Sequence, residues 1–117
     1  MGVVHHANYL VYFEADRVEA MRQVGVDYAS IVECGLHLVV IEACVRYVKP
    51  ARFDDLLEIH TRVPDIRRVR FTFSYIMVRD GDLVASGETV HACIEANRMR
   101  PQRLPEWLVD DLRRLNS

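Results

Sequence analysis

The sequence lacks the usual signs of a membrane, secreted or nucleic-acid-binding protein. No apolar run approaches the roughly 20 residues that a membrane-spanning helix needs, and the first residues lack the basic and apolar regions of a signal peptide. The formal net charge of -2 provides no general attraction to nucleic acid or to an anionic membrane. These absences predict a cytoplasmic protein that neither inserts into a membrane nor binds nucleic acid.

Cysteine is scarce, and no metal site is predicted. Cys34, Cys44 and Cys93 lie far apart without CxxC spacing, and their odd number in apolar surroundings indicates buried, reduced thiols. None of them resembles a nucleophile motif. His5 and His6 are adjacent, but no third ligand follows at a recognisable spacing, so we expect no bound metal.

Repeats, low-complexity stretches and Gly/Ser linkers are also absent. Residues 1–117 are therefore predicted to form a single domain. Hydrophobic residues make up 50% of the chain, which is enough for a packed core. A domain of this size buries only a modest fraction of its surface, so oligomerisation is favoured.

A long helix is predicted from Asn8 to Val24. Its apolar residues recur at helical spacing: Leu10, Phe13, Ala20, Met21 and Val24. Asn8 can cap the start, and Gly25 can end the helix in a left-handed conformation. Arg17 falls within the apolar face, where we expect its buried stem to pair with Glu14 or another carboxylate. A short second helix is predicted over residues 27–34.

From Leu36 onward the hydrophobic pattern changes to a period of two. Strands are predicted over residues 36–49, 56–63, 68–79 and 83–96, followed by a helix over 105–115. One face of the first strand should hold His37, Val39, Ile41, Ala43, Val45 and Tyr47. Pro64-Asp65 should end the second strand, and Asp80-Gly81 should form a hairpin turn. His37, His60 and His91 are interpreted as ordinary sheet residues.

The links between these strands are short, and only antiparallel neighbours can be joined in this way. The long helix must then pack its apolar face on the sheet. The predicted class is α+β.

Three stretches carry a family resemblance. They are GVVHHANY at residues 2–9 with YFE at 12–14, YVKPARFDD at 47–55, and Met99-Arg100-Pro101 with Leu104-Pro105. In this order and spacing they resemble the 4-hydroxybenzoyl-CoA thioesterase family, especially its short-chain acyl-CoA thioesterases associated with the Tol-Pal system. The resemblance implies a hotdog fold, an antiparallel sheet wrapped around one long helix. It also implies homodimers or homotetramers with active sites at subunit interfaces.

The activity that the resemblance implies is hydrolysis of a short-chain aliphatic or aromatic acyl-CoA to free acid and CoA. CoA is part of the substrate, so no cofactor is expected, and acyl carrier protein is a second candidate carrier. The family motif has an Asp three residues before the Gly that aligns with Gly2. That position, and the strand that precedes it, would lie before Met1. We therefore expect the domain to be N-terminally truncated relative to the family.

Two other functions stay open. A chain without that Asp could bind acyl-CoA or acyl carrier protein without hydrolysis. Hydration of an enoyl thioester is less favoured, because we find no Asp/His hydratase signature.

Thioester hydrolysis needs a carboxylate, a donor for the developing oxyanion, and contacts to CoA. By resemblance, the catalytic candidates in this chain are His6, Gly2 and Tyr9. The amide of His6 would be the oxyanion donor at the positive end of the helix, with Gly2 allowing close approach. The His6 imidazole could also orient the Asp or a water molecule. The alternative is that His6 and Tyr9 only pack at the start of the helix.

For CoA, the candidates are Arg67, Arg68 and Arg70. The aligned run in the family relative holds the nucleotide phosphates, and guanidinium groups donate bidentately to phosphate. The alternative is a solvated strand end, as charge runs usually are.

The segment after the first strand is interpreted structurally. Arg52, Asp54 and Asp55 are expected to stabilise a turn. Tyr47 and Phe53 could line an acyl pocket or pack in the core.

Overall fold

The computed structural model describes residues 6–50 and 56–116, with side chains from Tyr9 onward. The elements in chain order are α1 (His6–Gln23), α2 (Tyr28–Glu33), β1 (Leu36–Tyr47), β2 (Glu58–Ile66), β3 (Arg70–Arg79), β4 (Asp82–Glu95), β5 (Arg100–Pro101) and α3 (Glu106–Arg114). Every strand pairing is antiparallel. The predicted α+β class is confirmed.

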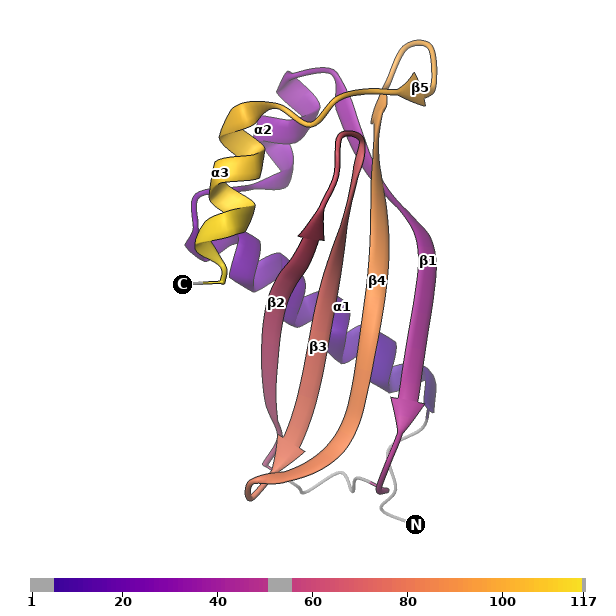
Figure 1. The fold of residues 1–117 in the computed structure, drawn as a ribbon, viewed down its shortest axis with the longest axis vertical. Coiled ribbons are helices and arrows are strands. Elements are labelled where there is room, and N and C mark those ends of the chain that lie inside the picture. Colours follow the sequence, from indigo (N-terminus) through magenta and orange to yellow (C-terminus); the bar gives the residue numbers. More distant parts are fainter. Residues whose placement is uncertain (1–5, 51–55, 117) are drawn as a thin grey trace.

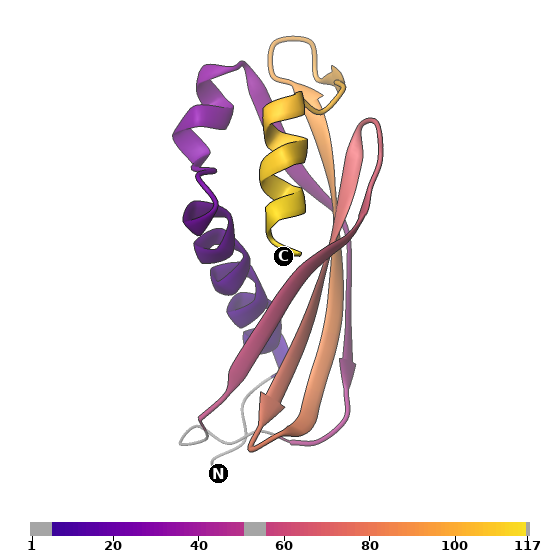
Figure 2. The same cartoon turned by 60° about the vertical axis from the view of Figure 1, so that its left-hand side comes forward.

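The strands form one sheet with the order β1-β4-β3-β2, and β5 pairs with the end of β4. Figure 1 shows α1 crossing the sheet, with its first turn near the end of β1. In Figure 2 the three helices lie on the same side of the sheet. The core therefore lies between the helices and one face of the sheet.

Alternate residues of β3 and β4 form the sheet side of this core. The buried ones are Phe71, Phe73, Tyr75 and Met77 on β3, and Ala85, Gly87, Thr89, His91 and Cys93 on β4. Phe13 of α1 stacks on Tyr75 with ring centroids 4.8 Å apart. It also presses on Gly87, where an added Cβ would lie 2.8 Å from Phe13 Cε2 and 2.9 Å from the Cys44 carbonyl oxygen. Gly87 therefore allows α1 to approach the sheet closely.

The face predicted for β1 is wrong in its first half. The register shifts between Val40 and Glu42, which is the mark of a β-bulge and moves one extra residue into the strand. Val40 lies opposite buried His91, whereas Ile41 falls at the shift and is 48% exposed. Leu38 and Val40, not His37 and Val39, therefore share the inner face with Val45 and Tyr47.

A second irregularity corrects the predicted end of β2. The strand continues through Pro64 to Ile66, because the register shifts between Arg62 and Asp65. Val63 drops out of the pairing there, and its N–H and C=O instead bond the Asn116 side-chain amide, each at 2.8 Å. A bulge allows a proline inside an edge strand. Here the bulge also leaves the backbone of Val63 to bond Asn116, which holds the segment after α3 against β2.

The helix ends differ slightly from the prediction. α1 begins at His6, two residues before the predicted cap, so Asn8 lies inside the helix. Tyr9 is 2% exposed and joins the buried face, whereas Leu10 is 38% exposed and does not. Gly25 ends the helix with φ of 97°, as predicted.

The remaining turns follow the sequence pattern. Asp27 caps α2 by accepting a bond of 2.7 Å from the Ser30 N–H. Asp80 and Gly81 have φ of 51° and 82°, as a tight hairpin turn requires. Pro105 is the residue before α3 rather than its first helical residue.

Two of the three cysteines are not buried. Cys93 lies in the core, but Cys34 and Cys44 are exposed. Cys34 directly follows α2, and Cys44 lies on the edge strand β1. In the part of the chain that the structure describes, no helix combines the length and apolar character needed to cross a membrane.

Candidate functional site

The start of α1 forms the first part of the candidate site. The helix begins at His6, so the backbone N–H groups of its first turn have no intrahelical partners and carry partial positive charge. Tyr9, one turn into the helix, is buried, and its ring lies 5.1 Å from the ring of Tyr47 at the end of β1. This aromatic pair joins the start of α1 to the sheet. Gly2 and the His6 side chain lie outside the described part of the structure.

Tyr47 is 45% exposed and lies beside the helix start through its contact with Tyr9. Two residues later, Lys49 Nζ lies 3.7 Å from Asp82 Oδ2. Phe53, Arg52, Asp54 and Asp55 lie outside the described residues. Across residues 6–50 and 56–116, no cluster of three or more His, Cys, Asp or Glu is placed to hold a metal ion.

The second part is a hollow of about 360 Å³ between the turn joining β2 to β3 and helix α3. We call it the arginine hollow; its charged lining residues are Arg67, Arg68, Arg103, Arg113, Glu106 and Asp110. α3 docks through its buried residues Leu108 and Leu112. The N–H of Leu104 donates to the Arg68 carbonyl at 2.9 Å, which ties the segment before α3 to the turn.

The arginine hollow carries an excess of positive charge, with four arginines against two carboxylates. Arg67 donates from Nε to Asp65 Oδ2 at 3.0 Å. Among the described residues, the other three arginines of the hollow pair with no carboxylate. Guanidinium groups grouped in this way suit the recognition of phosphate or carboxylate.

The sequence prediction found only part of this hollow. Arg67 and Arg68 line it, whereas Arg70 begins β3 and does not. Arg103 and Arg113 were missed, because they join the hollow only when α3 folds back onto the β2–β3 turn. The one signal available in the sequence was the basic pair Arg113-Arg114 in the last turn of α3.

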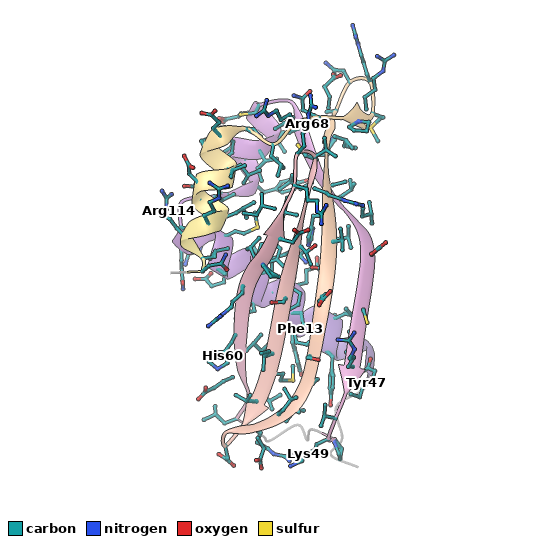
Figure 3. The ribbon with its side chains drawn as sticks, viewed as in Figure 1. Phe13, Tyr47, Lys49, His60, Arg68 and Arg114 are labelled. Atoms are coloured by element: carbon teal, nitrogen blue, oxygen red, sulfur yellow. The ribbon has the colours of Figure 1, made fainter. Side chains whose placement is uncertain are left out.

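The two parts lie at opposite ends of the sheet. In Figure 3, Arg68 is near one end of the molecule, and Tyr47 and Lys49 are near the other. Tyr47 is opposite Ala85, which is opposite Met77 on β3. Met77 and Arg70 are seven residues apart, or about 23 Å at 3.3 Å per residue. Within one copy of the chain, the start of α1 and the arginine hollow are therefore separate.

A long helix crossing an antiparallel sheet of the order β1-β4-β3-β2 is the hotdog fold. The sequence profile of the thioesterase-like superfamily matches residues 1–112. The chain belongs to this superfamily.

Individual relatives agree with this assignment. The chain is 33% identical over 113 residues to the 1,4-dihydroxy-2-naphthoyl-CoA hydrolase of Thermosynechococcus vestitus, covering 92% of this chain and 77% of the relative. It is 30% identical over 113 residues to the acyl-CoA thioester hydrolase YbgC of Escherichia coli, covering 96% and 84%. The crystal structure of a hypothetical protein from Thermus thermophilus is similar to this one with a TM-score of 0.87 and 36% identity, covering 98% and 88%.

Proposed function

We propose that this protein hydrolyses acyl-CoA thioesters to a free acid and CoA, with a short-chain aliphatic or aromatic acyl group. Membership of the thioesterase-like superfamily over residues 1–112 carries the proposal. The relatives named as acyl-CoA hydrolases support it. The start of α1 adds a physical argument, because the positive end of a helix dipole is suited to stabilise a negatively charged oxygen.

In the proposed reaction, the thioester carbonyl lies at the start of α1, beside Tyr9 and Tyr47. The oxygen gains charge as the carbonyl carbon is attacked, and it accepts a hydrogen bond from the His6 amide N–H. A carboxylate activates a water molecule that attacks the carbon, or it attacks the carbon itself and forms a mixed anhydride that water then hydrolyses to the free acid. The resemblance to the family puts this Asp three residues before Gly2. Thiols are much stronger acids than alcohols, with a pKa of about 8.5 for cysteine, so the CoA thiolate leaves with little help from a general acid.

The arginine hollow is our candidate for the phosphates of CoA, with Arg67 and Arg68 as ligands; Arg70 begins β3 and does not line it. It lies about 23 Å along the sheet from the proposed carbonyl position in the same copy. A homodimer or homotetramer could bring the helix start of one copy near the arginine hollow of another. We therefore propose a site shared between copies.

The test is thiol release from acetyl-CoA, butyryl-CoA and benzoyl-CoA by two N-terminally extended forms. One carries Asp three positions before Gly2 and the other carries Asn there. We expect turnover by the Asp form and a loss of at least about 100-fold in the Asn form, since nucleophile or base catalysis would be removed. Equal rates for the two forms would contradict the role of the carboxylate, and no turnover of any thioester by the Asp form would contradict hydrolysis.

The arginine hollow needs its own test. Arg68→Gln with Arg103→Gln should weaken CoA binding at least tenfold, because two charge-assisted phosphate contacts are lost. Arg98→Gln is the matched control, since Arg98 is exposed and does not line the hollow. CoA binding measured by calorimetry should be unchanged in the control. Equal effects of the two changes would argue against a phosphate site here.

A second candidate function is binding of acyl-CoA or acyl carrier protein without hydrolysis. The arginine hollow favours it as strongly as it favours catalysis, because phosphate binding needs no carboxylate. Tight CoA binding with no turnover by either extended form would support this function. The finer assignments, to the Tol-Pal-associated branch and to the cytoplasm, are part of the proposal; co-purification with Tol-Pal components and cell fractionation test them.

A further inference from the structure

A second hollow lies between α1, α2 and the inner face of the sheet, and it shares no lining residue with the arginine hollow. Its volume is about 190 Å³. We call it the apolar hollow: its wall includes Met21, Ile31, Leu38 and Phe71, and Arg17 and His91 supply polar groups. An apolar cavity of about 150 Å³ can take up benzene. The apolar hollow therefore has room for one aromatic ring or a short branched chain.

A chain of hydrogen bonds links Arg17 to His91, two of the polar residues that line this hollow. Arg17 Nη1 donates to the Tyr75 hydroxyl at 3.3 Å. The Tyr75 and Thr89 hydroxyls are 2.6 Å apart, and Thr89 Oγ1 is 2.8 Å from His91 Nε2. Phe71 stacks on the His91 ring at 5.2 Å, which fixes the plane of the imidazole.

The direction of this chain is set by Arg17, since a guanidinium can only donate. Tyr75 accepts from Arg17, which leaves its own proton for Thr89. We assign the Thr89 proton to the bond with Nε2 of His91, which continues the same direction along the chain. Burial and the charge of Arg17 lower the pKa of His91 to about 4, so the ring is neutral near pH 7. A neutral ring that accepts at Nε2 carries its proton on Nδ1.

The second ring nitrogen of His91 is Nδ1. No hydrogen bond to Nδ1 is found in the described part of the chain, where Nε2 bonds Thr89. That part also contains no enclosed side-chain nitrogen or oxygen that lacks a partner. Nδ1 must therefore be accessible, and His91 lines the apolar hollow.

Arg17 adds a positive charge that is only weakly compensated. Its side chain is 12% exposed, and its closest carboxylate in the described residues, Glu14, is 3.9 Å away and 67% exposed. Such a pair contributes little, because solvent screens it. At the rim, Arg22 pairs with Glu19, and Asp27 accepts from the Ser30 N–H. The wall of the apolar hollow thus offers two donors, one of them charged.

We propose that the apolar hollow binds a small apolar carboxylate, with its ring or branched chain against Phe71 and Leu38. The carboxylate accepts hydrogen bonds from Arg17 and from the His91 Nδ1–H. This site is distinct from the proposed thioester position: Arg17 follows His6 by eleven residues, or about 16 Å along the helix. The ligand class includes the acid that the proposed reaction would release, but the inference rests on the hollow and not on that reaction.

Benzoate is the first probe, with benzyl alcohol as an uncharged ligand of similar shape. Titration of the ¹⁵N-labelled protein with each should be followed in amide spectra. We expect benzoate to shift the amides of Met21, Ile31 and Leu38, and to bind at least tenfold more tightly than benzyl alcohol. This ligand pair tests the carboxylate preference on the unchanged protein. Equal affinities, or benzoate shifts only at other residues, would overturn the proposal.

One variant tests the charged donor, and a second variant is its control. Arg17→Gln should lower the affinity for benzoate at least tenfold, because the charged contact is removed. The affinity for benzyl alcohol should stay within about twofold. Arg98→Gln is the matched control, since Arg98 is exposed and does not line the apolar hollow; it should change neither affinity more than about twofold. If Arg17→Gln binds benzoate as the unchanged protein does, the proposal fails. Benzoate binding and thioester turnover are separate readouts, so either can fail without the other.

Discussion

β4 and β1 are paired along most of their length, yet they differ in how much of each is buried. Six of the 14 residues of β4 are buried, but only Leu36 among the 12 residues of β1 is. β4 is covered by α1 and flanked by strands on both sides, whereas β1 is an edge. Unpaired N–H and C=O groups along an edge strand favour pairing with another chain. β4 is thus held by packing within one copy of the chain, whereas β1 has an edge that a second copy can pair with.

The substitution that should disturb the packing of β4 most is Gly87→Val. A Cβ there would lie 2.9 Å from the Cys44 carbonyl oxygen and 2.8 Å from Phe13. Neither the backbone of β1 nor a ring stacked on Tyr75 can move freely, so we expect a loss of more than about 3 kcal/mol in the free energy of unfolding. Urea denaturation followed by circular dichroism measures it.

Ser86→Val is the control for this change, because Ser86 is the adjacent residue on the other face of β4. Valine suits a half-exposed strand position, so the free energy of unfolding should stay within about 0.5 kcal/mol. A loss below about 1 kcal/mol for Gly87→Val would show that α1 does not pack as closely as the structure indicates.

Acid should weaken the same strand through His91, although less than the glycine change. Burial and the charge of Arg17 lower the His91 pKa to about 4 from 6.5, and Tyr75 is the other titratable group in its hydrogen-bond chain. The unfolded chain therefore binds a proton more readily than the folded one between these values. Stability contributed by His91 is complete above about pH 6.5 and is lost as the pH falls toward 4.

The expected loss is about 2–3 kcal/mol between pH 7 and pH 4.5, since each pKa unit corresponds to about 1.4 kcal/mol. Urea denaturation at the two pH values measures it. In His91→Gln, the amide can still accept from Thr89 but does not titrate, so the pH-dependent loss should shrink by about that amount. An NMR titration that gives His91 an ordinary pKa would contradict the expectation.

The same contrast explains what could be predicted from the sequence. The alternating hydrophobic pattern was enough to predict β3, and the Asp-Gly pair was enough to predict the turn at Asp80-Gly81. Each depends only on residues that are adjacent in the chain. The face of β1 was misassigned because a bulge near Ile41 depends on how β4 pairs with it. Likewise, Arg67 and Arg68 are adjacent and were found, whereas Arg103 joins them only when the chain folds back.

The polar chain beneath the apolar hollow was missed for a similar reason. Arg17 and His91 lie 74 residues apart in the chain, and nothing local relates them. Arg17 was expected to pair with a carboxylate, and its 3.9 Å contact with Glu14 agrees with that. The bond to Tyr75, which links it to Thr89 and His91, depends on α1 lying across β3.

The smallest effect on folding is expected for two substitutions, Ile41→Lys and Ile76→Lys. Comparing them tests whether the edge strand β1 pairs with a second copy. The two isoleucines are 48% and 47% exposed, but Ile41 lies on the edge strand β1 and Ile76 on the interior strand β3. Each lysine should change the free energy of unfolding of one copy by less than about 0.5 kcal/mol. Charge on an edge strand discourages pairing with another chain, so only Ile41→Lys should weaken the proposed dimer. Sedimentation velocity over a range of protein concentrations measures this. If both variants dissociate equally, the copies do not meet through the β1 edge alone; if neither does, β1 is not the contact between them.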